Sequence, residues 1–172
     1  MKNLSRILYS LLFMLLLSGC GYHLPGGGSG LPDDIQKVVI VQFSNRTAQP
    51  FVETGLTNEV RDQFNRRRTL DVVANEKDAD AVLSGAVSAY SSSALSYDED
   101  DDITHYRVDI TVEAQLKRVA DGEIIWQGNV SWHEDFRSSP DRARQEYNER
   151  IVQVKINRRL AQEVYNRITD NF

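Results

Sequence analysis

The chain has 172 residues, 25 of them acidic and 20 basic, which gives a formal net charge of −5. This balance argues against a general nucleic-acid binder, because polyanion binding depends on clustered Lys and Arg that neutralise phosphates. A chain of this length suits a single domain with enough residues for a hydrophobic core.

The first residues have the pattern of a secretory signal, in which an early basic segment precedes an apolar run over residues 7–17. The run is roughly 11 residues long, too short for the ~20 that a membrane-spanning helix needs. It ends in Leu17-Ser18-Gly19-Cys20, which resembles the bacterial lipobox, whose cysteine is lipidated and becomes the new first residue. We therefore predict a signal peptide over residues 1–19 and lipidation at Cys20. The alternative for this only cysteine of the chain is a free thiol.

Lipidation at Cys20 would anchor the chain to a membrane, because several acyl chains together bind a bilayer stably. Gly21 stands where an Asp favours retention in the inner membrane, so this position resembles that of an outer-membrane lipoprotein. No cysteine remains for a disulfide, and stability must come from packing. The glycine-rich stretch that follows predicts a flexible tether, so residues 20–34 are assigned to the lipidated start and tether.

Residues 35–172 are expected to form one domain that begins with a strand. The segment Val38–Phe43 is a nearly unbroken apolar run, typical of a strand covered on both faces. Residues 44–50 read as a polar loop. From Phe51 the apolar residues recur every four positions, which predicts an amphipathic helix that ends near residues 66–68; they are Val52, Leu56, Val60 and Phe64.

A short strand over residues 70–73 and a turn over residues 75–80 lead to a second strand, predicted over residues 81–89. The acidic run Asp98–Asp102 follows. It lacks the alternating ligands, glycine turn and distal Glu of an ordered calcium loop, so we expect a solvated hairpin tip.

From Tyr106 to Lys117 apolar and polar residues alternate strictly, which predicts an antiparallel strand with one buried and one wet face. Asp121-Gly122 favours a turn, after which the chain should return as the partner strand. The residues of the returning strand that we expect on the buried face are Ile124, Trp126, Val130 and Trp132.

The last element is predicted as a helix from about Pro140 to Thr169, started by a serine cap. Its expected apolar stripe is Tyr147, Ile151, Val154, Ala161, Val164 and Ile168. At 1.5 Å per residue it would be roughly 45 Å long, so part of it should stand clear of the core and face a partner. The predicted fold class is α+β, two-layer, with a mostly antiparallel four-to-five-stranded sheet and two helices packed on one face.

Several of these features together resemble the LptE family, the lipopolysaccharide-assembly lipoproteins of the Gram-negative outer membrane. They are Cys20-Gly21-Tyr22-His23-Leu24 at the lipid site, the strand–helix unit, the strand entry Asp78–Leu83, the hairpin and the long final helix. The resemblance implies a protein without chemistry of its own. It would plug the lumen of a large β-barrel translocon of the LptD type, support assembly of that barrel and contact lipopolysaccharide.

Contact with lipopolysaccharide requires cations that pair with its phosphates. The candidates are Arg137, Arg142 and Arg144 at the junction of hairpin and final helix, with Arg107 and Lys117 on the strand face behind them. The alternative for each is an ordinary surface cation in a mixed-charge face. The acidic run Asp98–Asp102 argues against a phosphate site at its end of the hairpin.

Two other function classes are weighed against this one. For an enzyme, His23, His105 and His133 lack metal-ligand spacing, and Glu134 and Asp135 are adjacent on a strand and should point apart, so we expect neither catalysis nor a cofactor. The other class is an envelope lipoprotein accessory to a different outer-membrane secretion or assembly machine. The identity of the partner distinguishes it from a translocon plug.

Overall fold

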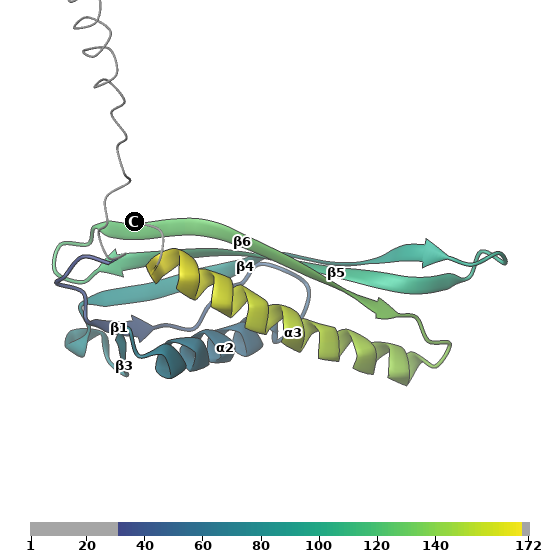
Figure 1. Cartoon of the computed structure of the whole chain (residues 1–172), viewed down its shortest axis with the longest axis horizontal. Coiled ribbons are helices and arrows are strands. Elements are labelled where there is room, and N and C mark those ends of the chain that lie inside the picture. The colour runs from purple at the N-terminus through teal and green to yellow at the C-terminus, as the bar shows by residue number, and fades with distance from the viewer. Residues whose placement is uncertain (1–30, 170–172) are drawn as a thin grey trace, which may run out of the picture.

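The computed structural model describes residues 31–169, arranged as a sheet with two long helices on one face (Figure 1). The signal peptide predicted over residues 1–19, the lipidation at Cys20 and most of the predicted tether lie outside the described residues. The element order is β1 (Lys37–Ile40), β2 (Ser44–Asn45), α2 (Val52–Arg67), β3 (Asp71–Val73), the 3-10 turn η1 (Glu76–Asp78), β4 (Ala81–Tyr97), β5 (Ile103–Arg118), β6 (Ile124–Arg137) and α3 (Arg142–Thr169).

The sheet has the strand order β3-β1-β4-β5-β6, and the short β2 also pairs with β4. β1 pairs in parallel with β3 and β4, whereas β4, β5 and β6 form a long antiparallel meander. The α+β class, the mostly antiparallel sheet and the two helices on one face are therefore confirmed. The sheet has six strands when the two-residue β2 is counted.

The core lies between this sheet and the helices. The spacing of apolar residues along the sequence explains which side chains are buried in it. Every second residue of β5 from Val108 to Leu116 is buried, as the alternation predicted. All four apolar residues expected on the first helix are buried as well, and the Phe64 ring meets Tyr165 of α3 edge-on at 5.0 Å. At about 1.5–3 kcal/mol for each large apolar side chain, this burial is the main term that holds the two layers together.

β4 and β5 extend well past the helical layer as a two-stranded ribbon (Figure 1). The strand predicted to end at Ala89 continues to Tyr97, because β5 supplies a pairing partner along the whole length. The acidic run forms the turn at the end of this ribbon, so the prediction of a hairpin tip is confirmed. Asp98 stabilises the turn by accepting the backbone N–H groups of Asp100 and Asp102, at 3.1 and 2.9 Å.

Two details of the strands differ from the expectation. The predicted loop over residues 44–50 begins with β2, because Ser44 and Asn45 pair in parallel with Ala86 and Val87. Ile124 was expected on the buried face, but it is exposed. A register shift between Leu116 and Lys117 places Ile124 opposite Lys117, and this irregularity turns its side chain to solvent.

The final helix differs from the prediction in its N-terminal cap and in its buried face. Asp141, and not a serine, caps α3, since its carboxylate accepts the N–H groups of Ala143 and Arg144 at 2.8 and 3.2 Å. In the first half of the helix the expected apolar stripe was wrong, because Val152 and Ile156 face the core. The side chains of Tyr147, Ile151 and Val154 are exposed.

Candidate functional site

The sheet face turned away from the helices, here called the outer face, is open and polar. It is lined by the side chains of β5 that alternate with its core residues, namely Arg107, Asp109, Thr111, Glu113, Gln115 and Lys117. Directly opposite them β4 contributes mostly small side chains, Ser84, Ala86, Ala89, Ser91 and Ser93. Val82 and Ile124, both opposite Lys117, are the larger apolar side chains at one end of this face. The rest of the surface is polar and suited to a wet environment.

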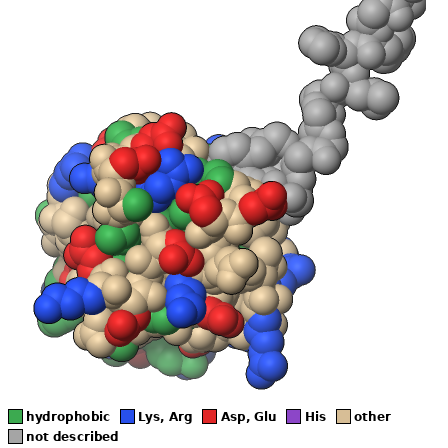
Figure 2. All heavy atoms as spheres, turned by 90° about the vertical axis from the view of Figure 1, so that its left-hand side faces the viewer, with side chains coloured by type: hydrophobic (Ala, Val, Ile, Leu, Met, Phe, Trp, Pro, Cys, Tyr) green, Lys and Arg blue, Asp and Glu red, His purple; other side chains and the backbone are tan. Residues whose placement is uncertain are grey.

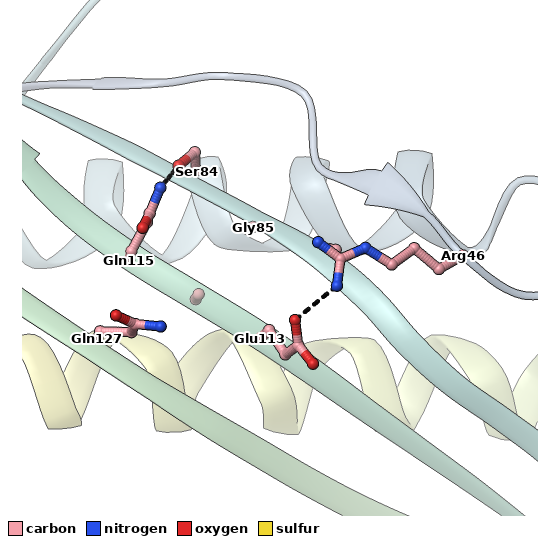
Figure 3. Close-up of a pocket in the computed structure, with 8 residues that line it drawn as sticks. Arg46, Ser84, Gly85, Glu113, Gln115 and Gln127 are labelled. Atoms are coloured by element: carbon pink, nitrogen blue, oxygen red, sulfur yellow. Dashed lines mark hydrogen bonds and ion pairs between the residues drawn. The ribbon is translucent and has the colours of Figure 1, made fainter.

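A shallow hollow of about 240 Å³ lies on this outer face (Figure 3). Arg46, which follows β2, reaches across β4 to Glu113, with 2.7 Å between Nη1 and Oε2. Gln115 donates to the hydroxyl of Ser84 at 3.3 Å, and Gln127 faces the same space from β6. The hollow therefore offers amides and a paired charge, which can hydrogen-bond a polar wall or a sugar.

Arg107 and Asp135 form a bidentate ion pair on the outer face. Nε and Nη2 of Arg107 donate to the two carboxylate oxygens of Asp135 at 2.7 and 3.0 Å, a bidentate arrangement. Hydrogen bonding by this guanidinium holds the pKa of Asp135 below its usual value. Arg107 is thus already paired, and an anionic ligand would have to compete with Asp135 for it.

A second hollow, here called the junction hollow, lies where β6 passes into α3 and has an open volume of about 660 Å³. Arg137 enters it from the end of β6 and Arg144 from the first turn of α3. The lining is completed by Ser138, Ser139, Asp141, Tyr147 and Asn148. Neither arginine has a carboxylate partner within ion-pair distance among residues 31–169, so both guanidinium groups are available to an anion.

The five predicted cations therefore do not form one site. Arg142 stands beside the junction hollow without lining it, and its almost fully exposed side chain pairs with Glu146 at 3.0 Å. Lys117 was expected behind the junction, which was wrong, because it lies at the other end of β5. Ten residues of strand, about 33 Å, separate it from Arg107. Of the five, Arg137 and Arg144 line one hollow.

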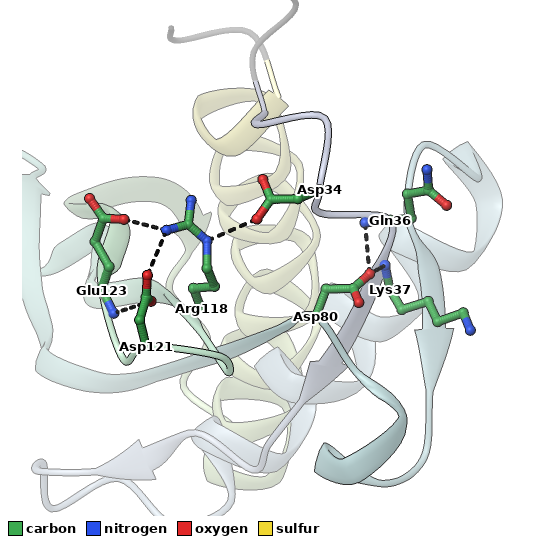
Figure 4. Close-up of polar contacts among 7 residues, drawn as sticks. All are labelled: Asp34, Gln36, Lys37, Asp80, Arg118, Asp121 and Glu123. Carbon is green, nitrogen blue, oxygen red and sulfur yellow. Dashed lines mark hydrogen bonds and ion pairs between the residues drawn. The ribbon is translucent and has the colours of Figure 1, made fainter.

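The end of the molecule where the described chain begins carries interspersed charges of both signs (Figure 2). There Arg118, the last residue of β5, binds Asp34 at 3.0 Å and also pairs with Asp121 and Glu123 of the β5–β6 turn (Figure 4). The backbone N–H of Glu123 and then Arg118 lower the pKa of Asp121. These ion pairs hold the segment before β1 against the β5–β6 turn.

Asp80 forms a second clamp at the same end (Figure 4). Its Oδ2 accepts the backbone N–H groups of Gln36 and Lys37 at 2.9 and 2.8 Å, and these two bonds lower its pKa. Its own N–H donates to the carbonyl of Lys37 at 2.9 Å. Asp80 thereby joins the start of β4 to the start of β1.

The residues considered for catalysis are not arranged for it. Glu134 lies on the helix side of β6, 3.4 Å from Nε1 of Trp132, whereas Asp135 is held by Arg107 on the outer face. No group of His, Cys, Asp and Glu in the described part of the chain could hold a metal ion. Within residues 31–169, no helix is long and apolar enough to cross a bilayer.

The fold and these surfaces define an α+β binding or scaffold domain. A family model described as LptE, lipopolysaccharide assembly, matches residues 35–168. The chain therefore belongs to the LptE family, as its motifs indicated, and it is a non-enzymatic lipoprotein of lipopolysaccharide assembly.

Solved structures of bacterial lipoproteins share the fold. The rare lipoprotein B from Shewanella oneidensis is 15% identical, with a TM-score of 0.55 over 76% of this chain and 92% of its own. The uncharacterized lipoprotein B from Nitrosomonas europaea is 13% identical, with a TM-score of 0.59 over 87% and 90%. The PelC dodecamer from Paraburkholderia phytofirmans is 18% identical, with a TM-score of 0.52 over 83% and 95%. A search of curated protein sequences found no match.

Sequence reasoning missed three residues of these surfaces. Arg46 and Gln127 line the hollow of the outer face because strand pairing brings distant segments together. No local sequence pattern indicates this position for either residue. Phe51, the residue before α2, is 77% exposed with a left-handed φ of 62°. In the sequence, Phe51 marks only the point from which the helical period begins, and this does not show whether its side chain is exposed.

Proposed function

We propose that this chain is an outer-membrane lipoprotein, anchored through Cys20, that occupies the lumen of a large β-barrel lipopolysaccharide translocon of the LptD type. In that position it supports assembly of the barrel and contacts lipopolysaccharide on the way to the outer leaflet. Membership of the LptE family is the observation that carries this proposal.

The outer face of the sheet supports a place inside a barrel. The lumen of a large outer-membrane barrel is polar, so a plug must present hydrophilic groups to it and still pack closely. Small side chains on β4 let a wall approach the sheet, and the charged and amide groups of β5 supply hydrogen bonds. The opposite face of the sheet packs against the helices, and this core keeps the domain folded when no barrel is present.

The junction hollow supports direct contact with lipopolysaccharide. Arg137 and Arg144 are unpaired within the described chain and open to the same space, so together they can grip a phosphate, with hydroxyls of Ser138 and Ser139 nearby. Tyr147 adds an aromatic surface at the edge for a sugar or an acyl chain.

Purification of the mature lipidated protein from its own outer membrane in detergent tests the partner. One large β-barrel protein recovered at a ratio of one to one is expected. Recovery of a different outer-membrane channel or assembly complex would replace the proposal with the alternative, an accessory lipoprotein of another envelope machine. Recovery of inner-membrane proteins alone would contradict both.

The charge-reversal pair Arg137→Glu/Arg144→Glu tests the ligand site. Binding of purified lipopolysaccharide to the mature protein should weaken by about tenfold or more, because a charged hydrogen bond is worth roughly 1.5–3 kcal/mol. Arg142→Glu is the matched control, since Arg142 is a neighbouring exposed cation that does not line the junction hollow. Equal loss of binding in both variants would indicate a nonspecific charge effect and would contradict the assignment.

A further inference from the structure

β4 has an open edge over the second half of its length. On the side of β4 away from β5, β1 pairs with residues 81–83, and β2 pairs with Ala86 and Val87. β2 ends there, and the N–H of Arg46 donates to the carbonyl of Val87 at 3.0 Å. β4 runs on to Tyr97 (Figure 1), and within residues 31–169 no strand pairs with this side of it beyond Val87.

The register between β4 and β5 shows which main-chain groups lie on the open edge. Up to Val87, every second residue of β4 faces β1 and β2, since the carbonyls of Leu83 and Val87 both accept N–H groups from that side. A register shift between Val87 and Ala89 inserts one residue and moves the alternation by one. Beyond it, the residues whose N–H and C=O groups face the open side are Tyr90, Ser92 and Ala94.

The segment Ala89–Ala94, here called the β4 edge, is regular and held in place. Its residues pair one to one with β5 between two register shifts, and β6 continues the sheet behind β5. The hydroxyl of Tyr90 donates to Oε1 of Glu149 in α3 at 2.5 Å, which ties the start of the segment to the helical layer. The open N–H and C=O pairs therefore repeat about every 7 Å along a fixed strand.

The two open edges of the β4–β5–β6 meander differ in how they are protected. An unpaired strand can accept another strand, and proteins block such pairing with charged side chains, prolines and covering groups. β6 carries Glu134, Asp135 and Arg137, and Arg167 of α3 donates to the carbonyl of Asn129 at 2.9 Å. The β4 edge has the sequence Ala-Tyr-Ser-Ser-Ser-Ala, without a charge, a proline or a glycine. Its composition does not oppose pairing.

The chemistry of the β4 edge specifies the kind of molecule that fits it. N–H donors and C=O acceptors at this spacing are matched by the main chain of another extended polypeptide, whereas an acyl chain offers no hydrogen-bonding groups. The exposed residues of the edge have small side chains, so β-branched or aromatic side chains of an added strand can pack over them. These residues are Ala89, Ser91, Ser92 and Ser93.

We propose that the β4 edge binds an extended segment of the β-barrel partner, about six residues long, which adds a strand to the sheet. This inference rests on the proposed function and specifies one contact within it. The wall strands of a closed barrel are paired on both sides and have no free edge to offer. The added strand must therefore come from a loop or a terminal segment of the barrel protein.

Amide hydrogen exchange tests the contact, measured on the mature lipidated protein alone and in the complex purified in detergent. The amides of Tyr90, Ser92 and Ala94 should exchange about tenfold or more slowly in the complex, because each gains a hydrogen bond. The amides of Ser131 and His133 are the matched control. They alternate with the β5-paired residues of β6 in register with Asn129, so they face its open edge, and they should change little.

A pair of proline variants tests whether the main chain makes the contact. The N–H of Ser92 faces the open side, so Ser92→Pro removes a donor to the partner without removing a bond to β5. It should abolish the slowing at Tyr90 and Ala94 and lower recovery of the barrel protein several-fold. Ser131→Pro makes the same change on the open edge of β6 and should leave both unaffected. Urea unfolding of each variant checks that the fold is retained.

The outcomes distinguish this inference from the proposed function. A barrel protein recovered with unchanged exchange at the β4 edge, or with equal slowing at both edges, would overturn the added strand and leave the proposed function standing. Failure to recover any barrel protein would overturn both. Slowing that appears in the isolated protein as its concentration is raised would identify a second copy as the occupant and would also overturn the proposal. If Ser92→Pro does not fold, the exchange of the unsubstituted protein decides.

Discussion

Asp80 shows how a single side chain joins two parts of the fold. Its carboxylate accepts two backbone N–H groups at the start of β1, the strand between β3 and β4. The residue belongs to the Asp78–Leu83 segment that marked the family in the sequence. Its role here is structural, because it sets the register between β1 and β4.

Asp80→Asn is expected to lower the free energy of unfolding by about 1 kcal/mol at pH 7, less than the roughly 1.5–3 kcal/mol of charged hydrogen bonds because solvent screens this group. The lowered pKa of Asp80 means that this contribution is present above pH 3.8 and is lost as the pH falls through the pKa of the folded state. Urea unfolding of both proteins should therefore differ at pH 7, and the difference should shrink as the pH is lowered below 3.8. The control is Asp62→Asn, an exposed residue without a side-chain partner among residues 31–169. A pH-independent difference would contradict this account.

Gly85 is required because the space beside it is already filled. A Cβ at this position would lie 2.5 Å from the carbonyl oxygen of Glu113 and 2.5 Å from the ring of Phe43. Gly85→Ala should destabilise the fold by about 1–3 kcal/mol through overpacking, as measured by urea unfolding. Ser84→Ala, the neighbouring change on the outer face, should stay within about 0.5 kcal/mol. Similar values for the two variants would contradict a tight contact at Gly85.

The two halves of α3 differ in how much of their surface is buried. Its buried face shifts along the helix, from Val152 and Ile156 near the middle to Val164 and Ile168 at the end. One reason is that the first half packs against the sheet alone, whereas the second half also packs against α2. The exposed first half depends more on its own cap.

Asp141→Ala should therefore act locally on α3. We expect a loss of about 1 kcal/mol, the usual cost of removing a capping side chain. Amide hydrogen exchange should accelerate in the first two turns of α3 and remain unchanged in its last two. Ser139→Ala is the control, because within residues 31–169 the hydroxyl of Ser139 accepts only the N–H of Asp141, at 3.3 Å. Faster exchange along the whole helix would contradict a local effect.

The strands and helices that the sequence predicted well are those with one repeating pattern. β5 alternates strictly because one of its faces is buried along its whole length, and α2 repeats every four residues because one of its sides stays in the core. The exposure of Ile124 follows from a register irregularity, and β2 consists of two residues, so neither leaves a local pattern. That Arg137 and Arg144 lie close together could be predicted from the sequence, because both adjoin one short turn. The distance of Lys117 from them follows only when the full length of β5 is taken into account.

At the scale of the whole molecule, protection from hydrogen exchange should decrease with distance from the helical layer. The start of β4 has neighbours on both sides and helices below, whereas residues 90–97 pair only with β5. Regions with fewer buried contacts open at lower free energy. Amides of residues 81–87 should therefore exchange more slowly than those of residues 91–97 in the same strand. Equal rates would indicate that the ribbon is stabilised by contacts outside this chain.

The parallel pairing of β1 and β4 also determines how the domain would bear mechanical load. A pull from the lipid anchor enters at Leu31, is first resisted by the ion pair between Asp34 and Arg118, and then acts on the start of β1. If the far end of β4 is held by a partner, the force runs along both strands in opposite senses. The bonds between them then share the load in shear instead of opening one at a time. Such a domain would tolerate tension between a membrane and a partner better than its short first strand suggests.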